Sequence, residues 1–121
     1  MVGFIERHAG GEKAILVHVD LPEMVYTDAL LEFEELVKAA NLRTMSVLKT
    51  KRKEPQARSF IGKGKLEDLV ALVKLHAADV VVFNHKLSPA QARNLEEECC
   101  CKVIDRTELI LDIFAQRARS F

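Results

Sequence analysis

Apolar residues follow two alternating patterns along this chain: short continuous runs, and longer stretches in which they recur every three or four positions. Residues 13–19 and 80–83 are β-branched apolar runs, which predict strands buried on both faces. Residues 43–48 alternate enough to predict another strand, and residues 102–104 predict a short fourth one. The first 12 residues show little periodicity and predict a flexible lead-in.

The stretches between and after these strands have the spacing of amphipathic helices. In the first helix we predict that Leu30, Phe33, Val37 and Ala40 face inward. In the second helix the predicted inward residues are Leu66, Leu69, Val70 and Val73, and in the last helix they are Leu109, Ile110, Ile113 and Phe114. Thr27 or Asp28 is expected to cap the first helix, and Asn41 to end it. The third helix begins with a capping box, Ser88-Pro89-Ala90-Gln91.

Alternation of strands and helices predicts an α/β fold, with a small, mostly parallel four-stranded sheet flanked by helices. We expect a lead-in at 1–12, an α/β domain at 13–106 and an exit helix at 107–121. The last helix has no closing Gly or Pro, so we expect the chain to be a fragment, with a helical hairpin following it. Ligands of parallel sheets lie beyond the carboxyl ends of the strands.

The composition, 121 residues of which 49% are apolar, indicates one globular domain with a single core. No apolar run approaches the roughly 20 residues needed to span a bilayer, and no secretory signal is evident, so we expect a cytoplasmic protein. Three consecutive cysteines, Cys99 to Cys101, lack metal-ligand spacing and are interpreted as small apolar residues at a helix end. His18 and His85 make a weak case for a metal, and we predict no metal site.

Charge is distributed very unevenly. The chain has 18 basic and 18 acidic residues, yet residues 49–65 carry a net charge of +6 and the remainder −6. The basic residues of this segment are Lys49, Lys51, Arg52, Lys53, Arg58, Lys63 and Lys65. We expect residues 49–59 to form a mobile surface loop, and so many charges along a loop favour a polyanion such as RNA.

Gly62 and Gly64 lie in the string Gly62-Lys63-Gly64-Lys65, just before the second predicted helix. Glycines let a backbone approach a partner closely, and a helix N-terminus favours phosphate. The string is not a P-loop, because Leu66 stands where that motif needs Ser or Thr, and it lacks the third glycine of the dinucleotide fingerprint. A tight turn in a solvated basic loop remains the alternative.

Four strings together resemble the N-terminal domain of the bacterial GTPase family HflX. They are LVHVDLPEM (16–24), FIGKGK (60–65), VVFNHKLSPAQARNLE (81–96) and, most specifically, KVIDRTELILDIFAQRAR (102–119). The resemblance covers residues 13–121. It implies a small parallel α/β unit that is followed, in the family, by a helical hairpin and a Ras-like G domain.

The resemblance also implies a function. The family binds the large ribosomal subunit, contacts its rRNA through the N-terminal domain and the hairpin, and splits stalled or stressed ribosomes. GTP and Mg²⁺ belong to the G domain, so this chain is expected to have no catalytic residues, no cofactor and no GTPase activity of its own. Its expected partners are the large subunit, rRNA and its own G domain. The family is also described as binding ATP through its N-terminal part, which leaves a nucleotide-binding or hydrolysing domain built on the GKGK turn as the alternative.

Residue by residue, the FIGKGK match supports an RNA-facing role for Lys63 and Lys65. The DRT match marks Asp105, Arg106 and Thr107 as a structural signature, in which Thr107 or Asp105 caps the last helix. Arg106 either braces Asp105, which we favour, or reaches outward. The residues that either orient the hairpin or lie on an ordinary helix surface are Gln116, Arg117 and Arg119.

Two further hypotheses follow from the residues. An enzyme would need a general base and a metal ligand at the carboxyl ends of the strands, where the candidates are Asp20, Asn84 and His85. An interaction module would use the last helix, where Leu109, Ile113 and Phe121 are expected to be partly uncovered. Any dimer formed that way is interpreted as an effect of truncation or of crystal packing.

Overall fold

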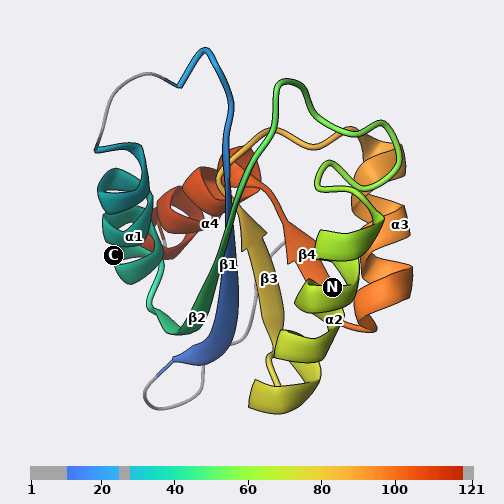
Figure 1. Cartoon of the computed structure of the whole chain (residues 1–121). Coiled ribbons are helices and arrows are strands. Elements are labelled where there is room, and N and C mark those ends of the chain that lie inside the picture. Colours follow the sequence, from blue (N-terminus) through green and yellow to red (C-terminus); the bar gives the residue numbers. More distant parts are fainter. Residues whose placement is uncertain (1–10, 25–27, 119–121) are drawn as a thin grey trace.

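The structure is a computed structural model that describes residues 11–24 and 28–118. Strands and helices alternate through it in chain order (Figure 1). The elements are β1 (Glu12–Asp20), α1 (Ala29–Ala39), β2 (Leu42–Lys51), α2 (Lys63–His76), β3 (Val80–Phe83), α3 (Pro89–Cys99), β4 (Lys102–Ile104) and α4 (Arg106–Ala118). Residues 1–10 of the predicted lead-in lie outside the described residues, and Glu12 already belongs to β1.

The four strands form one sheet in the order β2-β1-β3-β4, and every pairing is parallel. This confirms the predicted α/β class. The carboxyl ends of all four strands therefore lie at the same end of the sheet, at the top of Figure 1. We call this end the carboxyl edge. The chain runs outward in opposite directions from β1 and β3, and this central pair is the position where parallel sheets hold ligands.

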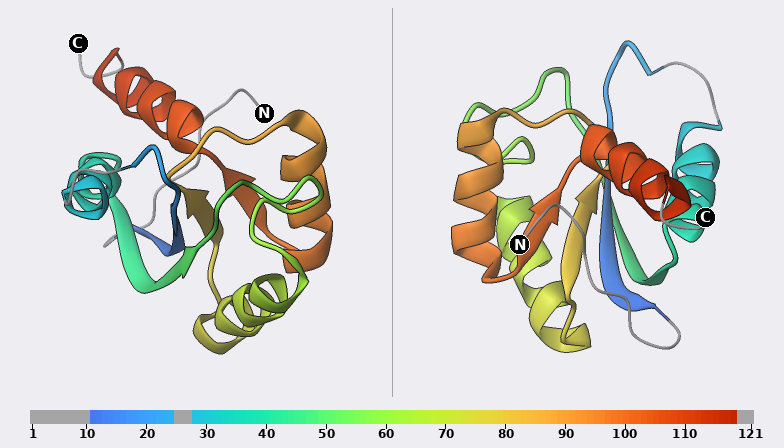
Figure 2. Two further views of the ribbon diagram at one scale, coloured as in Figure 1. Left: turned by 45° about the horizontal axis from the view of Figure 1, so that its top comes forward. Right: turned by 180° about the vertical axis from the view of Figure 1, so that it is seen from behind.

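Helices cover both faces of the sheet, α1 and α4 on one and α2 and α3 on the other (Figure 2). Alternate residues of β1 serve two separate cores, as expected for a central strand. Ile15 and Val17 pack beneath α2 and α3, whereas Leu16 packs with Phe33 of α1 and Leu109 of α4. Burial on both faces explains why β1 reads as a continuous apolar run.

Most helix ends follow the local signals. The Ser88 hydroxyl accepts from Gln91 N at 3.1 Å and the Gln91 amide oxygen accepts from Ser88 N at 2.9 Å, which confirms the capping box. Asn41 ends α1 with a φ of +62°. Asp28 occupies the N-cap position of α1 without a side-chain hydrogen bond, and Thr27 lies outside the described residues.

The predicted orientation of the last helix is partly wrong. Phe114 is 64% exposed, whereas Leu109 and Ile113, which were expected to be partly uncovered, are buried. Leu109, Asp112, Ile113 and Gln116 share the inward stripe, and Phe114 lies about 140° around the helix from Leu109 at 100° per residue. Gln116 holds this orientation because its amide nitrogen donates to Ala40 O at the end of α1, at 3.0 Å. Leu111 is exposed on the outer side, and Phe121 lies outside the described residues.

Candidate functional site

The basic segment contains more strand and more internal hydrogen bonds than the predicted loop. β2 continues to Lys51, so Lys49 and Lys51 belong to an edge strand and not to the predicted loop. Within the loop, Gln56 and Phe60 exchange backbone hydrogen bonds of 3.1 and 2.8 Å. Phe60 and the following Ile61 are buried and anchor the loop to the core.

Helix α3 also holds this loop. The Gln91 amide donates to Gln56 O at 3.0 Å, and the Asn94 amide donates to Arg58 O at 3.1 Å. Gln56 was missed by the sequence analysis, because an exposed-looking glutamine in a polar segment carries no local signal. One partner, Gln91, lies 35 residues away, and the others belong to the turn that Gln56 helps to form.

Most of the basic side chains of the segment are not neutralised by the domain's own acids. Lys65 lies 3.8 Å from Asp68, and Arg52 donates to the carbonyl oxygens of Glu54 and Ile61, so these two have internal partners. The other five are exposed and make no ion pair within the described part of the chain: Lys49, Lys51, Lys53, Arg58 and Lys63. Positive charge therefore remains available to an external anion.

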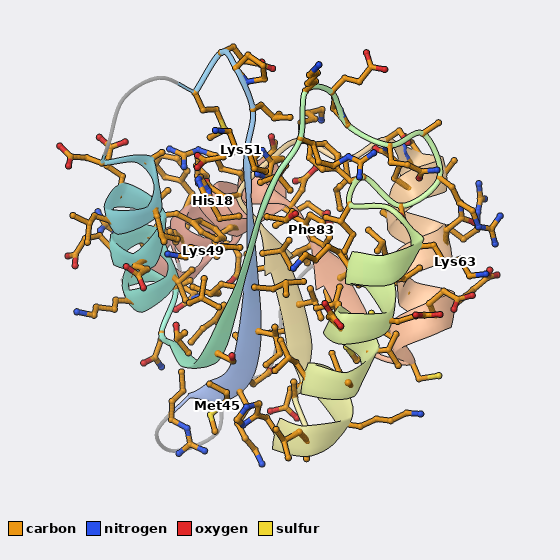
Figure 3. All side chains as sticks on the ribbon, in the orientation of Figure 1. His18, Met45, Lys49, Lys51, Lys63 and Phe83 are labelled. Carbon is orange, nitrogen blue, oxygen red and sulfur yellow. The ribbon has the colours of Figure 1, made fainter. Side chains whose placement is uncertain are left out.

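These charges do not form a single cluster. Figure 3 shows Lys49 and Lys51 on the side of α1, and Lys63 on the opposite side of the view, near α3. Lys51, Arg52 and Lys53 line a hollow of about 540 Å³. Arg58 and Lys63 line a second one of about 230 Å³, which also contains Glu98. The basic segment thus presents two separate regions.

The two glycines of the GKGK string have different environments. Gly62 has a φ of +83°, and a Cβ there would lie 2.9 Å from Nη1 of Arg52, so the close approach that it permits is to the protein's own guanidinium. Gly64 lies inside α2 with no atom within 4 Å of a Cβ. The helix begins at Lys63, so three of the four residues of the predicted turn are helical.

A row of polar side chains crosses the carboxyl edge on the α1 side of the sheet. Arg106 Nη1 donates to Asn84 Oδ1 at 2.8 Å, and Asn84 Nδ2 lies 3.0 Å from His18 Nδ1. His18 Nε2 is 3.5 Å from Asp20 Oδ1. The structure therefore does bring Asp20 and Asn84 to this edge, as predicted. The expectation that Arg106 braces Asp105 is wrong, because the register of β4 directs Arg106 toward Asn84.

His85 is unsuited to act as a general base. Its Nε2 accepts a hydrogen bond from Val19 N at 2.8 Å, and its ring stacks between those of His18 and Phe60, with centroids 5.6 and 4.9 Å away. Burial, assisted by the charges of His18 and Arg106, lowers the pKa of His85 to about 4. The ring is therefore neutral at pH 7, and its lone pair is already occupied.

Asp105 joins two elements at this edge. Its Oδ1 accepts from Glu108 N at 3.0 Å and caps α4, and its Oδ2 accepts from Leu87 N at 3.0 Å in the loop before α3. Thr107 is exposed. The cap of the last helix is therefore Asp105, one of the two alternatives considered above.

The described residues give little evidence of a metal site or of a reactive thiol. No group of three or more His, Cys, Asp or Glu side chains there is arranged to hold a metal ion. Burial raises the pKa of Cys99 to about 12 and that of Cys101 to about 11, so both thiols are protonated at neutral pH. Among the described helices, none combines the length and apolar character needed to cross a bilayer.

Comparison with known proteins identifies the family. The profile described as "GTP-binding GTPase N-terminal" matches residues 27–115. The GTPase HflX of Escherichia coli K12 is 49% identical over 115 residues, which is 95% of this chain. The chain belongs to the HflX GTPase family. It corresponds to the N-terminal domain of that family.

A second member of the family gives a similar match. GTPase HflX of Alkalihalophilus pseudofirmus is 41% identical over 111 residues. That alignment includes 90% of this chain but only 26% of the relative. The alignment with the E. coli protein includes 27% of that protein. The chain therefore spans about a quarter of the HflX proteins that it matches.

Solved structures share the fold. "Crystal structure of SsGBP and GDP complex" superposes with a TM-score of 0.68 at 24% identity, covering 86% of this chain and 29% of that one. A GTP-binding protein from Sulfolobus solfataricus in complex with GDP gives a TM-score of 0.65, also at 24% identity, over 85% of this chain and 30% of that one. At this identity the likeness establishes the architecture alone.

Proposed function

We propose that this chain is the ribosome-binding domain of an HflX-type GTPase, which docks on rRNA of the large subunit in the cytoplasm. In the proposal the whole protein splits stalled or stressed ribosomes, and GTP hydrolysis with Mg²⁺ takes place in its G domain. This chain contributes binding and no hydrolysis.

The observation that supports the proposal is the set of five exposed basic side chains without acidic partners around the carboxyl edge. Lysine and arginine side chains that neutralise phosphates release counterions from the RNA, and that release is favourable at physiological salt. Because β2 and the hydrogen-bonded loop hold the backbone of the segment in place, less backbone entropy is lost on docking than with a mobile loop.

The carboxyl edge also sets the direction of α4. Asp105 caps the helix, Arg106 bonds Asn84 and Gln116 bonds Ala40 O, so its start and its last turn are both tied to the rest of the domain. We infer that α4 transmits the position of the docked domain to the segment that follows it in the family.

The alternative, a nucleotide-hydrolysing domain built on the GKGK turn, is less well supported. Arg52 occupies the space beside Gly62, and the small hollow near Lys63 contains the carboxylate of Glu98, which repels phosphate. His85 lacks a free lone pair. No described arrangement therefore combines a phosphate cradle with a general base.

The test is sedimentation of the chain with purified large ribosomal subunits between about 50 and 200 mM salt. Each single substitution should reduce the magnitude of the slope of log affinity against log salt by about one unit. The variants are Lys49→Ala, Lys51→Ala, Lys53→Ala and Lys63→Ala. Matched controls are Lys74→Ala and Lys102→Ala, which change exposed lysines near the amino ends of the strands, away from the carboxyl edge. Unchanged slopes in all four variants would remove the basic segment from the interface.

A phosphate-release assay tests the second part of the proposal. The chain alone, incubated with GTP or ATP and Mg²⁺, should release phosphate no faster than a protein-free blank. Release that exceeds the blank and disappears in His85→Gln would instead support the hydrolytic alternative.

A further inference from the structure

The hollow lined by Lys51, Arg52 and Lys53 combines two kinds of lining. Leu21, Pro22 and Met24 make an apolar floor, while Lys51 and Lys53 stand at the rim with Arg52. Its volume of about 540 Å³ lies within the usual range for small-molecule sites. Contact with the phosphates of an RNA helix requires the basic rim but makes no use of the floor.

The hollow is also preformed. Arg52 N donates to Asp20 O at 3.0 Å and joins its two walls, and Met24 N donates to Leu21 O at 2.9 Å and closes the turn that forms the floor. Leu21 and Met24 pack on the core beneath α2 and α3. A ligand therefore meets a shaped surface and does not have to order one.

We propose that this hollow takes one unpaired nucleotide of the RNA, with its base against Leu21 and Met24 and its phosphates against Lys51 and Lys53. This inference rests on the proposed function. A duplex keeps its bases stacked inside the helix and offers only its backbone, whereas a bulged or looped nucleotide can place its base on an apolar surface. Both parts of the hollow are then used.

Asp20 sets the orientation of the nucleotide. Its carboxylate is 63% exposed at the rim and lies close to His18. It repels phosphate and accepts hydrogen bonds, so it favours a ribose hydroxyl or an exocyclic amine on its side, and the phosphates lie toward Lys51 and Lys53.

The test compares two RNA hairpins of equal charge, one fully paired and one with a single bulged 2-aminopurine, titrated with the chain at constant salt. The bulged hairpin should bind about fivefold more tightly or better, and the fluorescence of its 2-aminopurine should change on binding. Met24→Ser should remove the preference and leave the affinity for the paired hairpin unchanged. Lys53→Ala should weaken binding of both hairpins.

Leu75→Ser is the matched control, because Leu75 is 76% exposed on α2 and outside the hollow. Pro22→Glu provides a second variant at an exposed position of the floor, so that the conclusion does not depend on the folding of Met24→Ser. It should abolish the preference for the bulge.

Equal affinity for the two hairpins overturns this inference. Displacement of the bulged hairpin by an equal concentration of free AMP overturns it as well, since the ligand is then a mononucleotide. Either result, obtained while the chain still binds large subunits with a lysine-dependent salt slope, refutes the nucleotide site and leaves the proposed function standing. If the chain does not bind large subunits at all, the proposed function itself is refuted.

Discussion

The guanidinium of Arg106 donates to the amide oxygen of Asn84 at 2.8 Å, and this bond joins the first residue of α4 to the residue that follows β3. Asn84 is buried, and its amide nitrogen lies 3.0 Å from His18 on β1. The direction in which α4 leaves the sheet is therefore coupled to the two central strands.

Arg106→Ala should destabilise the domain by about 1–3 kcal/mol, because the buried oxygen of Asn84 loses its charged donor. Arg117→Ala, which changes an exposed arginine on the same helix, should alter stability by less than about 0.5 kcal/mol. Urea unfolding followed by circular dichroism measures both. Equal midpoints for the two variants would show that the bond to Asn84 contributes nothing to stability.

His85 should make the domain sensitive to acid. Its pKa is about 4 in the folded protein and 6.5 in an unfolded chain, so between these values the unfolded state binds more protons. Stability should therefore fall as the pH is lowered from 6.5 toward 4, by roughly 1 kcal/mol per pH unit at most.

His85→Gln should reduce this pH dependence, because glutamine can accept the bond from Val19 N without titrating. His76→Gln, at the end of α2, is the control and should keep the slope of the unchanged protein. The measurement is the urea midpoint at several pH values. An identical acid slope in His85→Gln would mean that other groups cause the loss of stability.

The two glycines before and within α2 should respond oppositely to alanine. Gly62→Ala places a Cβ 2.9 Å from Arg52 Nη1 at a φ of +83°, and it should cost about 1–2 kcal/mol. Gly64→Ala meets open space in a helix and should stabilise by about 0.5 kcal/mol. Thermal unfolding distinguishes them. A destabilised Gly64→Ala would contradict the helical assignment of that residue.

Asp105→Ala should cost about 2–3 kcal/mol, because one carboxylate serves both as the cap of α4 and as the acceptor for Leu87 N. Thr107→Ala changes an exposed side chain and should be nearly neutral. Unfolding midpoints of the two variants, measured side by side, test which residue is the cap. A larger effect at Thr107 would reverse the assignment.

The order of elements was predictable because its signals are local. A capping box at Ser88, the left-handed stop at Asn41 and the continuous apolar run of β3 each depend on residues a few positions apart. The basic segment was recognisable for the same reason, since charge can be counted along the chain.

The orientation of individual side chains was not predictable in this way. Arg106 was expected beside Asp105 and lies on Asn84, 22 residues away in sequence, and His85 loses its basicity through Val19 N and burial under Phe60. Phe114 faces outward because Leu109 and Ile113 occupy the buried side of α4, on which Gln116 also bonds Ala40 O. Helical periodicity alone did not show which side of α4 faces α1.

The amino-acid sequence alone thus determined the class of fold, the family and the location of the excess positive charge, because periodicity, motif strings and charge are properties of neighbouring residues. The tertiary structure decided which of those charges remain unpaired and which hollow they border. It also decided that the polar residues of the carboxyl edge bond one another, because these properties depend on distances between strands that are far apart in the chain.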